Sequence, residues 1–258
     1  MNNLLLRILS ALVMLPVAIA LILFGGWAYT VVILLLSVLI LLEWNMITTG
    51  KWKTPLFLVQ ALLVIALGCG MKLQGTVTII DVIVFLNAVL LAALLSKKDF
   101  KLAIAGGFYA LLPALAMIWL REFVVGGAYV ILWAMIIVWS MDTGAYFAGK
   151  KIGGPKMSPR ISPNKTWAGL VGGALLAVVT GVMSARFFGF EPLYLYAAAS
   201  IVLALWSQVG DLAESAVKRK FDVKDSGAII PGHGGIMDRV DGILFVMPVV
   251  ALYLYFGA

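Results

Sequence analysis

The chain has 258 residues, of which 63% are hydrophobic and only 12% are charged, with a formal net charge of +7. A soluble globular domain carries about 25% charged residues, so this composition, with a mean hydropathy of +1.08, excludes that class and indicates a polytopic membrane protein. The length accommodates about eight or nine helical spans of roughly 20 residues and no separate soluble domain. We therefore expect a single all-α membrane domain over residues 1–258.

Nine apolar windows lack Lys and Arg in their interiors, and each is predicted to cross the membrane as a helix. They cover approximately residues 5–24, 27–47, 55–71, 76–96, 102–120, 124–147, 168–188, 193–217 and 240–257. The third window is the shortest. The first resembles a signal peptide, but the rest of the chain is equally apolar, so we expect it to remain as an uncleaved span.

The basic residues between the windows predict the orientation of the chain. With a cytoplasmic amino terminus, 16 of the 19 Lys and Arg residues lie on the cytoplasmic side, and only Lys72, Arg121 and Arg186 lie outside. Cytoplasmic loops of membrane proteins carry an excess of Lys and Arg. We therefore expect a cytoplasmic amino terminus, an outer carboxyl terminus and a net charge that does not indicate nucleic-acid binding.

Residues 149–167, GKKIGGPKMSPRISPNKTW, form the first of two long polar segments. Its three prolines and three glycines exclude a continuous helix and predict an ordered cytoplasmic loop that is rich in backbone donors.

The second polar segment, residues 218–237, ends in a Gly-rich turn just before the last window. The turn contains the only histidine, His233, followed by Gly234 and Gly235. Backbone N–H groups of such a turn can converge on an anion because no Cβ atoms intervene. The nearby basic residues are Lys218, Arg219 and Arg239. Together these features predict a phosphate cradle, although a helix cap alone would also account for the glycines.

Four carboxylates are predicted to lie at one depth near the cytoplasmic boundary. A helix rise of about 1.5 Å per residue places Asp142 and Asp211 roughly 27 Å from the outer ends of their windows. Asp238 and Asp241 open the last window at the same level. Burying one charge costs about 2.5–3.5 kcal/mol, so this clustering predicts a wet cavity or bound cations. Hard oxygen ligands favour Mg²⁺ over zinc.

An alternative interpretation pairs these acids with Lys or Arg as ordinary anchors at the headgroup level. It is favoured for Asp99, Asp222 and Asp225, which lie in loops beside lysines. Asp81 is expected to be structural, and Glu43 is left undecided between the two interpretations.

The segment from Ser215 to Asp241 resembles the signature of CDP-diacylglycerol synthases, also called phosphatidate cytidylyltransferases. The residues that carry the resemblance are Ser215, Lys218, Arg219, Lys224, Asp225, His233, Gly234, Gly235, Asp238, Arg239 and Asp241. Residues 142–147 and 161–169 are similar to further motifs of the family, with one departure at Ala168, where many members have Glu or Gln. Residues 1–120 match only as generic apolar spans, and their role is left open.

The resemblance implies a Mg²⁺-dependent membrane enzyme that condenses CTP with phosphatidic acid to give CDP-diacylglycerol and pyrophosphate in phospholipid biosynthesis. Its catalytic half would be residues 124–258, with cytoplasmic loops 149–167 and 218–237. The expected metal ligands are Asp211, Asp238, Asp241 and Asp142, with room for a second cation. The residues expected to bind the phosphates are Lys218, Arg219, Arg239, Ser162, Lys165, Thr166, Lys224, His233, Gly234 and Gly235.

The resemblance also implies a place in the cell and a set of partners. We expect an integral protein of the inner (plasma) membrane of a prokaryote-like cell, with the site at the cytoplasmic face. The expected partners are CTP, phosphatidic acid and the bilayer, without nucleic acid, and a homodimer is compatible with them.

Two other functions are compatible with parts of the pattern. The nearer is a CTP-dependent transferase or kinase that acts on another lipid phosphate or on a polyprenol. The more remote is a cation-coupled transporter, which predicts acids at the midplane of the membrane and repeated halves. The sequence shows no such repeat, and its acids are predicted at one face.

Overall fold

The computed structural model describes residues 3–52, 54–76, 78–96, 100–227, 229 and 234–257, and this part of the chain forms nine helices and one two-stranded sheet. The predicted all-α class is therefore confirmed. The chain divides into two compact units. The first contains Met1–Ala128 with Val223–Val240, and the second contains Tyr129–Asp222 with Asp241–Ala258.

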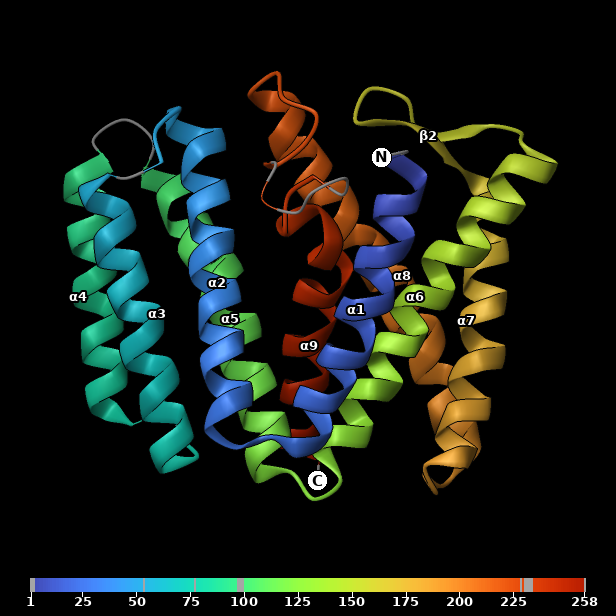
Figure 1. Cartoon of the computed structure of the whole chain (residues 1–258), viewed down its shortest axis with the longest axis horizontal. Helices are drawn as coiled ribbons and strands as arrows, with labels where there is room; N and C mark the ends of the chain where they lie inside the picture. The colour runs from blue at the N-terminus through green and yellow to red at the C-terminus, as the bar shows by residue number, and fades with distance from the viewer. Residues whose placement is uncertain are drawn as a thin grey trace. The chain divides into compact units, whose positions relative to one another are not determined.

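The first unit contains five helices and the segment Val223–Val240, and the second to fifth helices form a bundle (Figure 1). The helices are α1 (Asn3–Phe24), α2 (Gly26–Thr49), α3 (Pro55–Gln74), α4 (Ile79–Ser96) and α5 (Phe100–Phe123). Helix α5 packs against α2, α3 and α4, and α3 also packs against α2 and α4. Residues such as Leu41, Val64 and Ile118 are almost completely buried between them. These large aliphatic contacts hold the bundle together.

The ends of α2 and α3 follow from short sequence signals. Gly50 and Gly75 end the two helices in the left-handed conformation, with φ of 69° and 71°. Thr54 begins α3, because its hydroxyl accepts a hydrogen bond from Phe57 N at 3.1 Å and Pro55 fits the first helical position.

The third predicted window ended too early, at residue 71. Helix α3 continues to Gln74 and is longer than α4, which has 18 residues. The window stops at Lys72 because the windows admit no Lys or Arg in their interiors. In the structure Lys72 forms an ion pair with Glu122 of α5, and this pairing allows the helix to continue past the charge.

The second unit contains α6 (Gly127–Ile152), β1 (Lys156–Ser158), β2 (Ser162–Thr166), α7 (Trp167–Phe187), α8 (Leu193–Lys220) and α9 (Met237–Gly257), although α6 and α9 begin in residues of the first unit. Strands β1 and β2 are antiparallel, with Lys156 opposite Thr166 and Ser158 opposite Ser162. The segment 149–167 is thus ordered as predicted, but the strands were not predicted.

Both predicted polar loops also began too early. Helix α6 continues to Ile152 instead of ending before residue 149, and α8 continues to Lys220 instead of ending before residue 218. Both extensions run through basic residues. Cations in the last turn of a helix are stabilised by its dipole, so the basic runs prolong the helices.

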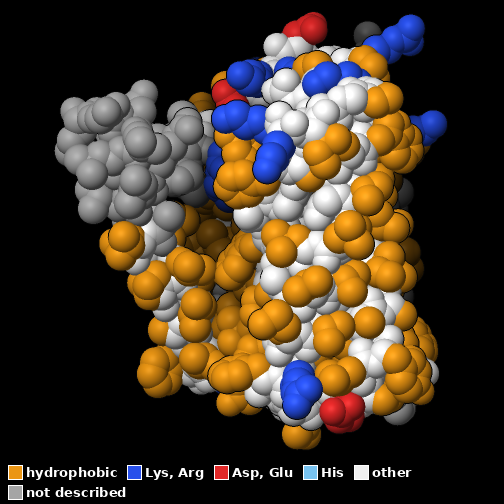
Figure 2. Space-filling view, turned by 90° about the vertical axis from the view of Figure 1, so that its right-hand side faces the viewer, with side chains coloured by type: hydrophobic (Ala, Val, Ile, Leu, Met, Phe, Trp, Pro, Cys, Tyr) orange, Lys and Arg blue, Asp and Glu red, His pale blue; other side chains and the backbone are white. Residues whose placement is uncertain are grey.

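Large apolar side chains cover much of the outer surface of the helices. Leu62, Leu175 and Met183, for example, are 68%, 64% and 67% exposed. On the face seen in Figure 2, hydrophobic side chains cover the middle, and most Lys and Arg lie at its upper end. Within the described residues, seven helices are long and apolar enough to cross a membrane, and Leu12–Phe24 of α1 is a shorter apolar helix. The number of spans and the orientation of the amino terminus remain predictions.

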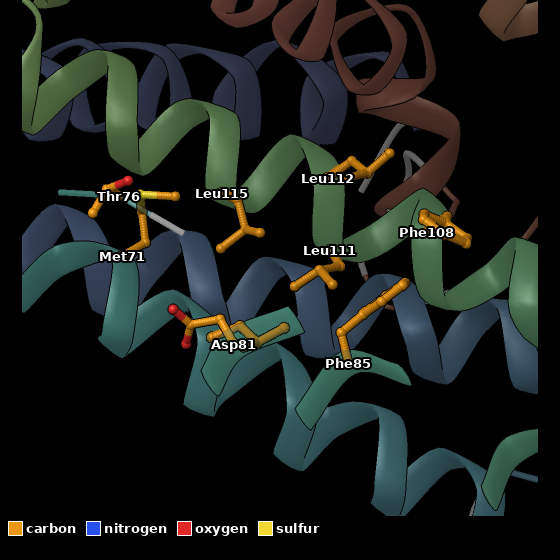
Figure 3. A pocket seen from close by; sticks show the side chains of 9 residues that line it. Met71, Thr76, Asp81, Phe85, Phe108, Leu111, Leu112 and Leu115 are labelled. Carbon is orange, nitrogen blue, oxygen red and sulfur yellow. The ribbon is translucent and has the colours of Figure 1, made fainter. Parts of the chain in front are cut away.

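A cavity of about 200 Å³ lies between α3, α4 and α5 in the first unit (Figure 3). Its walls are mainly Leu, Met and Phe side chains, and Thr76 and Asp81 also line it. The Asp81 carboxylate accepts hydrogen bonds from the backbone N–H and the hydroxyl of Thr78, at 2.8 and 2.7 Å. This reciprocal cap begins α4, so Asp81 has an evident role in the structure of the helix end.

Candidate active site

Two glycines bring α8 and α9 together beside their acidic residues. A Cβ atom at Gly210 would lie 2.9 Å from the carbonyl oxygen of Asp241, and one at Gly242 would lie 3.2 Å from the Cβ of Ser207. Only helices without side chains at these points can approach so closely. Asp211 and Asp241 follow or precede these glycines directly, and the two carboxylates interact electrostatically.

Helix α6 adds a third carboxylate to the same unit. A Cβ atom at Gly144 would lie 2.8 Å from the Cα of Gly173, so α6 and α7 are also in close contact. Asp142, half a turn before Gly144, accepts a hydrogen bond from Gln208 Nε2 at 3.1 Å and interacts electrostatically with Asp211. Asp142, Asp211 and Asp241 thus come from three helices to one region.

Lys165 reaches this region from the end of β2. Its Nζ lies 2.6 Å from Asp211 Oδ2, in an ion pair whose side chains are 17% and 30% exposed. The ammonium is buried, but the contact does not have the geometry of a directed hydrogen bond, and none is found for it in the part of the chain that the structure describes. Lys165 therefore supplies positive charge to the acids while retaining unused donors.

Further polar side chains of α8 follow Asp211 toward the helix end. Ser215 Oγ donates to Asp211 Oδ1 at 3.3 Å, and Lys218 Nζ lies 2.9 Å from Glu214 Oε1, whose side chain is completely buried. Arg219 Nε donates to the carbonyl oxygen of Ile161 at 3.3 Å. This last contact ties the end of α8 to the turn between β1 and β2.

Asp238 belongs to the first unit and has different partners. Its Oδ2 accepts hydrogen bonds from the backbone N–H of Ser226 at 2.9 Å, the Ser226 hydroxyl at 2.9 Å and the backbone N–H of Gly235 at 3.1 Å. Asp238 thereby fixes the segment that leads into α9, three residues before Asp241 on the same helix.

The other predicted phosphate-binding residues have diverse surroundings. Ser162 and Lys165 lie on β2, whereas the Thr166 hydroxyl is buried and accepts a hydrogen bond from Gly169 N at 3.1 Å as the cap of α7. Lys224 and Arg239 are exposed. Gly234 has φ of 85°, a conformation that favours glycine. His233 lies outside the described residues.

The predicted metal ligands do not form a ready binding site. Among the residues that the structure describes, no group of three or more Asp, Glu, His or Cys side chains is arranged to hold a metal ion. The ion pair with Lys165 also uses one oxygen of Asp211. The donors nevertheless fit a hard cation, since Asp241 interacts electrostatically with three other acids, Asp142, Asp211 and Glu214.

The sequence did not identify four residues of these clusters as site residues. Gln208 and Glu214 contact Asp142 and Lys218, and Glu43 and Ser226 surround the start of α9. Glu214 had a signal in the sequence, because it follows Asp211 by three residues and precedes Lys218 by four, which puts all three on one face of the helix. Glu43 had one too, as the single acid of an apolar helix, but its partners are nearly 200 residues away in the chain.

Comparisons with known proteins agree with the resemblance seen in the sequence. The model of the cytidylyltransferase family matches residues 5–256. A phosphatidate cytidylyltransferase of Brucella suis biovar 1 is 38% identical over 259 aligned positions, which cover 100% of this chain and 94% of the relative. The enzyme of the same name from Bacillus subtilis is 49% identical over 118 residues, 45% of this chain and 42% of the relative. That of Staphylococcus saprophyticus is 46% identical over 114 residues, 44% of each.

Proposed function

The chain belongs to the cytidylyltransferase family, and from this membership we infer that it transfers CMP from CTP to phosphatidate, giving CDP-diacylglycerol and pyrophosphate. The observation that carries this inference is the match over almost the whole chain. An oxygen of the phosphatidate phosphate attacks the α-phosphorus of CTP and forms a new P–O bond. The bond from that phosphorus to the bridging oxygen breaks, and pyrophosphate leaves with its electron pair. No covalent enzyme intermediate is needed, because the nucleophile is already an anion.

We propose that Lys165 is the principal cation of the chain at the reacting phosphates. Two anionic substrates repel each other, so fixed positive charge must lower the energy of their approach. The ammonium of Lys165 is buried beside Asp211 and has unused N–H donors. A phosphate oxygen that enters this region would take up those donors, and the ammonium would then share its charge between Asp211 and the substrate.

We also propose Mg²⁺ as the cofactor, held by Asp142, Asp211 and Asp241. These carboxylates supply the hard oxygen ligands that Mg²⁺ prefers, and their mutual repulsion favours a bound cation. When bound, the ion would neutralise phosphate charge and withdraw electron density from the α-phosphorus. Asp238, three residues before Asp241 on α9, is proposed as a further ligand on the resemblance alone.

The remaining basic residues would bind CTP phosphates or the leaving pyrophosphate. Lys218 and Arg219 lie at the end of α8, and Arg219 already contacts the β1–β2 turn. Arg239 is exposed in the first turn of α9. We place this site at the cytoplasmic face of a bacterial inner membrane, because the positive-inside pattern puts the segments that carry these residues on that side.

The proposed activity is tested with purified protein in detergent, given Mg²⁺, CTP labelled at the α-phosphate and phosphatidic acid. We expect label in the lipid phase and one pyrophosphate released for each labelled lipid. Polyprenol phosphate in place of phosphatidic acid tests the nearest alternative substrate. The absence of CMP transfer to phosphatidic acid with any divalent cation would contradict the proposal.

Asp238→Asn distinguishes a role of Asp238 in cation binding from its role in fixing the segment that leads into α9. The amide oxygen of asparagine can still accept the hydrogen bonds from Ser226 and Gly235, so the fold around α9 is expected to persist while the charge is lost. We expect CMP transfer to fall by about 100-fold or more, with an unchanged melting temperature. Asp238→Ala, which loses both roles, should lower activity and melting temperature together. Full activity in Asp238→Asn would remove Asp238 from the proposed ligands.

A further inference from the structure

Glu43 is a completely buried acid in a helix that is otherwise mostly apolar. It is the single acidic residue of α2, and its exposed fraction is 0%. A buried carboxylate is stable only where hydrogen bonds or opposite charge replace water. Its contacts therefore indicate what it stabilises.

The partners of Glu43 are backbone amides at the start of α9. Glu43 Oε1 accepts a hydrogen bond from Ile236 N, and Oε2 accepts one from Met237 N, both at 2.8 Å. The first N–H groups of a helix have no partners within it and carry partial positive charge, so they stabilise an anion. Within the described residues no salt bridge includes Glu43. The acid is thus held by the helix end that it orders.

Ser226 connects Glu43 to Asp238. Its hydroxyl oxygen lies 2.9 Å from Glu43 Oε2 and 2.9 Å from Asp238 Oδ2. A serine hydroxyl donates only one proton at a time, so the two carboxylates share one donor. A change in the position or charge of one carboxylate is therefore transmitted to the other.

The surroundings of Glu43 leave its carboxylate little freedom. A Cβ atom at Gly235 would lie 1.8 Å from Ser226 Oγ and 2.7 Å from Glu43 Oε2, and one at Gly227 would lie 2.8 Å from Glu43 Oε1. Both positions therefore require glycine. The packing fixes Glu43, Ser226 and the start of α9 as one rigid group.

We propose that Glu43 is a positioning residue for CMP transfer, which orients the Asp238 carboxylate for cation binding through the first amides of α9 and the Ser226 hydroxyl. The proposal rests on the role of Asp238 in the proposed function. It gives the amino-terminal half of the chain, whose role the sequence left open, a part in the reaction.

Glu43→Gln tests the proposal. The glutamine keeps the size of the side chain, but its NH₂ group must face donors of α9 or Ser226, so the group around Asp238 is disturbed. The first readout is the rise in melting temperature with Mg²⁺ concentration in the absence of substrates, which reports cation binding. We expect the Mg²⁺ midpoint to increase about 10–100-fold, as for other residues that support metal ligands. The Mg²⁺ concentration that gives half-maximal CMP transfer should increase by the same factor. The rate should partly recover at high Mg²⁺.

Glu122→Gln is the matched control. Glu122 is also a nearly buried acid of the first unit that accepts a hydrogen bond from a helix amino terminus, Gly26 N at 2.7 Å. Its other partner among the described residues is Lys72, and it does not contact Ser226 or Asp238. It should lower the melting temperature and leave the Mg²⁺ midpoint unchanged. An equal increase of the Mg²⁺ midpoint in both variants would mean that Glu43→Gln acts by general destabilisation. That result would overturn the proposal.

Ser226→Ala provides a second test that keeps the amide contacts of Glu43. It removes only the shared hydroxyl, and we expect the midpoint to move in the same direction. If Glu43→Gln does not fold, Ser226→Ala is the test of the proposal. A wild-type midpoint in Ser226→Ala would then overturn the proposal. If Asp238→Asn displaces the midpoint and folded Glu43→Gln does not, the positioning role alone fails. If Asp238→Asn has a wild-type midpoint, the role of Asp238 in the proposed function fails.

Discussion

Asp211→Asn is expected to lower the rate of CMP transfer by at least about 100–1,000-fold, the range found when one group that stabilises transition-state charge is removed. Asp211 interacts electrostatically with both other carboxylates, Asp142 and Asp241, and it also forms an ion pair with Lys165. Asparagine keeps the shape of the side chain but loses the charge that would attract both a cation and the lysine. Initial rates at saturating CTP and phosphatidic acid measure the loss.

The stability of Asp211→Asn should remain close to that of the wild type. The ion pair with Lys165 is lost, but repulsion from Asp142 and Asp241 is relieved at the same time. Asp81→Asn is the matched control, because Asp81 is also an acid of an apolar helix but caps its own helix through Thr78. We expect that control to keep near wild-type turnover. Wild-type turnover in Asp211→Asn would refute the assignment of the carboxylate cluster as the active site.

Lys165→Met is expected to lower kcat/KM for CTP by about 100-fold, because methionine has a similar length and no charge to offset the phosphates. The same variant removes the ammonium group that pairs with Asp211. We therefore expect Mg²⁺ to bind more tightly to the variant in the absence of CTP, even though turnover falls. Isothermal titration of Mg²⁺, together with the kinetics, measures the two opposite effects.

Two variants on the same hairpin serve as references for Lys165→Met. Lys165→Arg keeps the charge and should retain part of the activity. Lys156→Met removes an exposed lysine from β1 and should leave kcat/KM within about twofold, since exposed charges contribute little. If Lys156→Met and Lys165→Met were equally impaired, the net charge of the hairpin would matter and the position of Lys165 would not.

Most helices could be predicted from the sequence because each is an apolar run of membrane-spanning length that ends at a recognisable residue. Gly50, Gly75 and the Thr54–Pro55 pair mark their ends by local chemistry alone. The errors lie where a basic residue is taken to end a span. Lys72 is neutralised by Glu122, which is distant in the sequence, and the basic residues at the ends of α6 and α8 are stabilised by the helix dipole. Both effects depend on the folded helix.

The site could be predicted only in part, because local patterns do not give the tertiary contacts of a side chain. Counting residues along a straight helix predicts the depth of Asp142 and Asp211, but it does not predict the partners of a side chain. Lys165 was expected at a phosphate, and its pairing with Asp211 depends on a hairpin that the prolines and glycines of the loop did not reveal. Glu43 could be singled out as a charge in an apolar helix, but contacts with Ile236 and Met237 require the tertiary fold.

The position of Lys165 has a consequence for the timing of turnover. The next residue, Thr166, both ends β2 and caps α7, and Trp167 N donates to the carbonyl oxygen of Pro155 at 3.1 Å. The backbone of Lys165 is thereby tied to a membrane helix, and only its side chain is left to exchange Asp211 for a phosphate. Rotation of a side chain is faster by orders of magnitude than the microsecond-to-millisecond rearrangement of a loop. The exchange of partners by Lys165 would then be faster than the binding of each nucleotide and would not limit the rate of turnover.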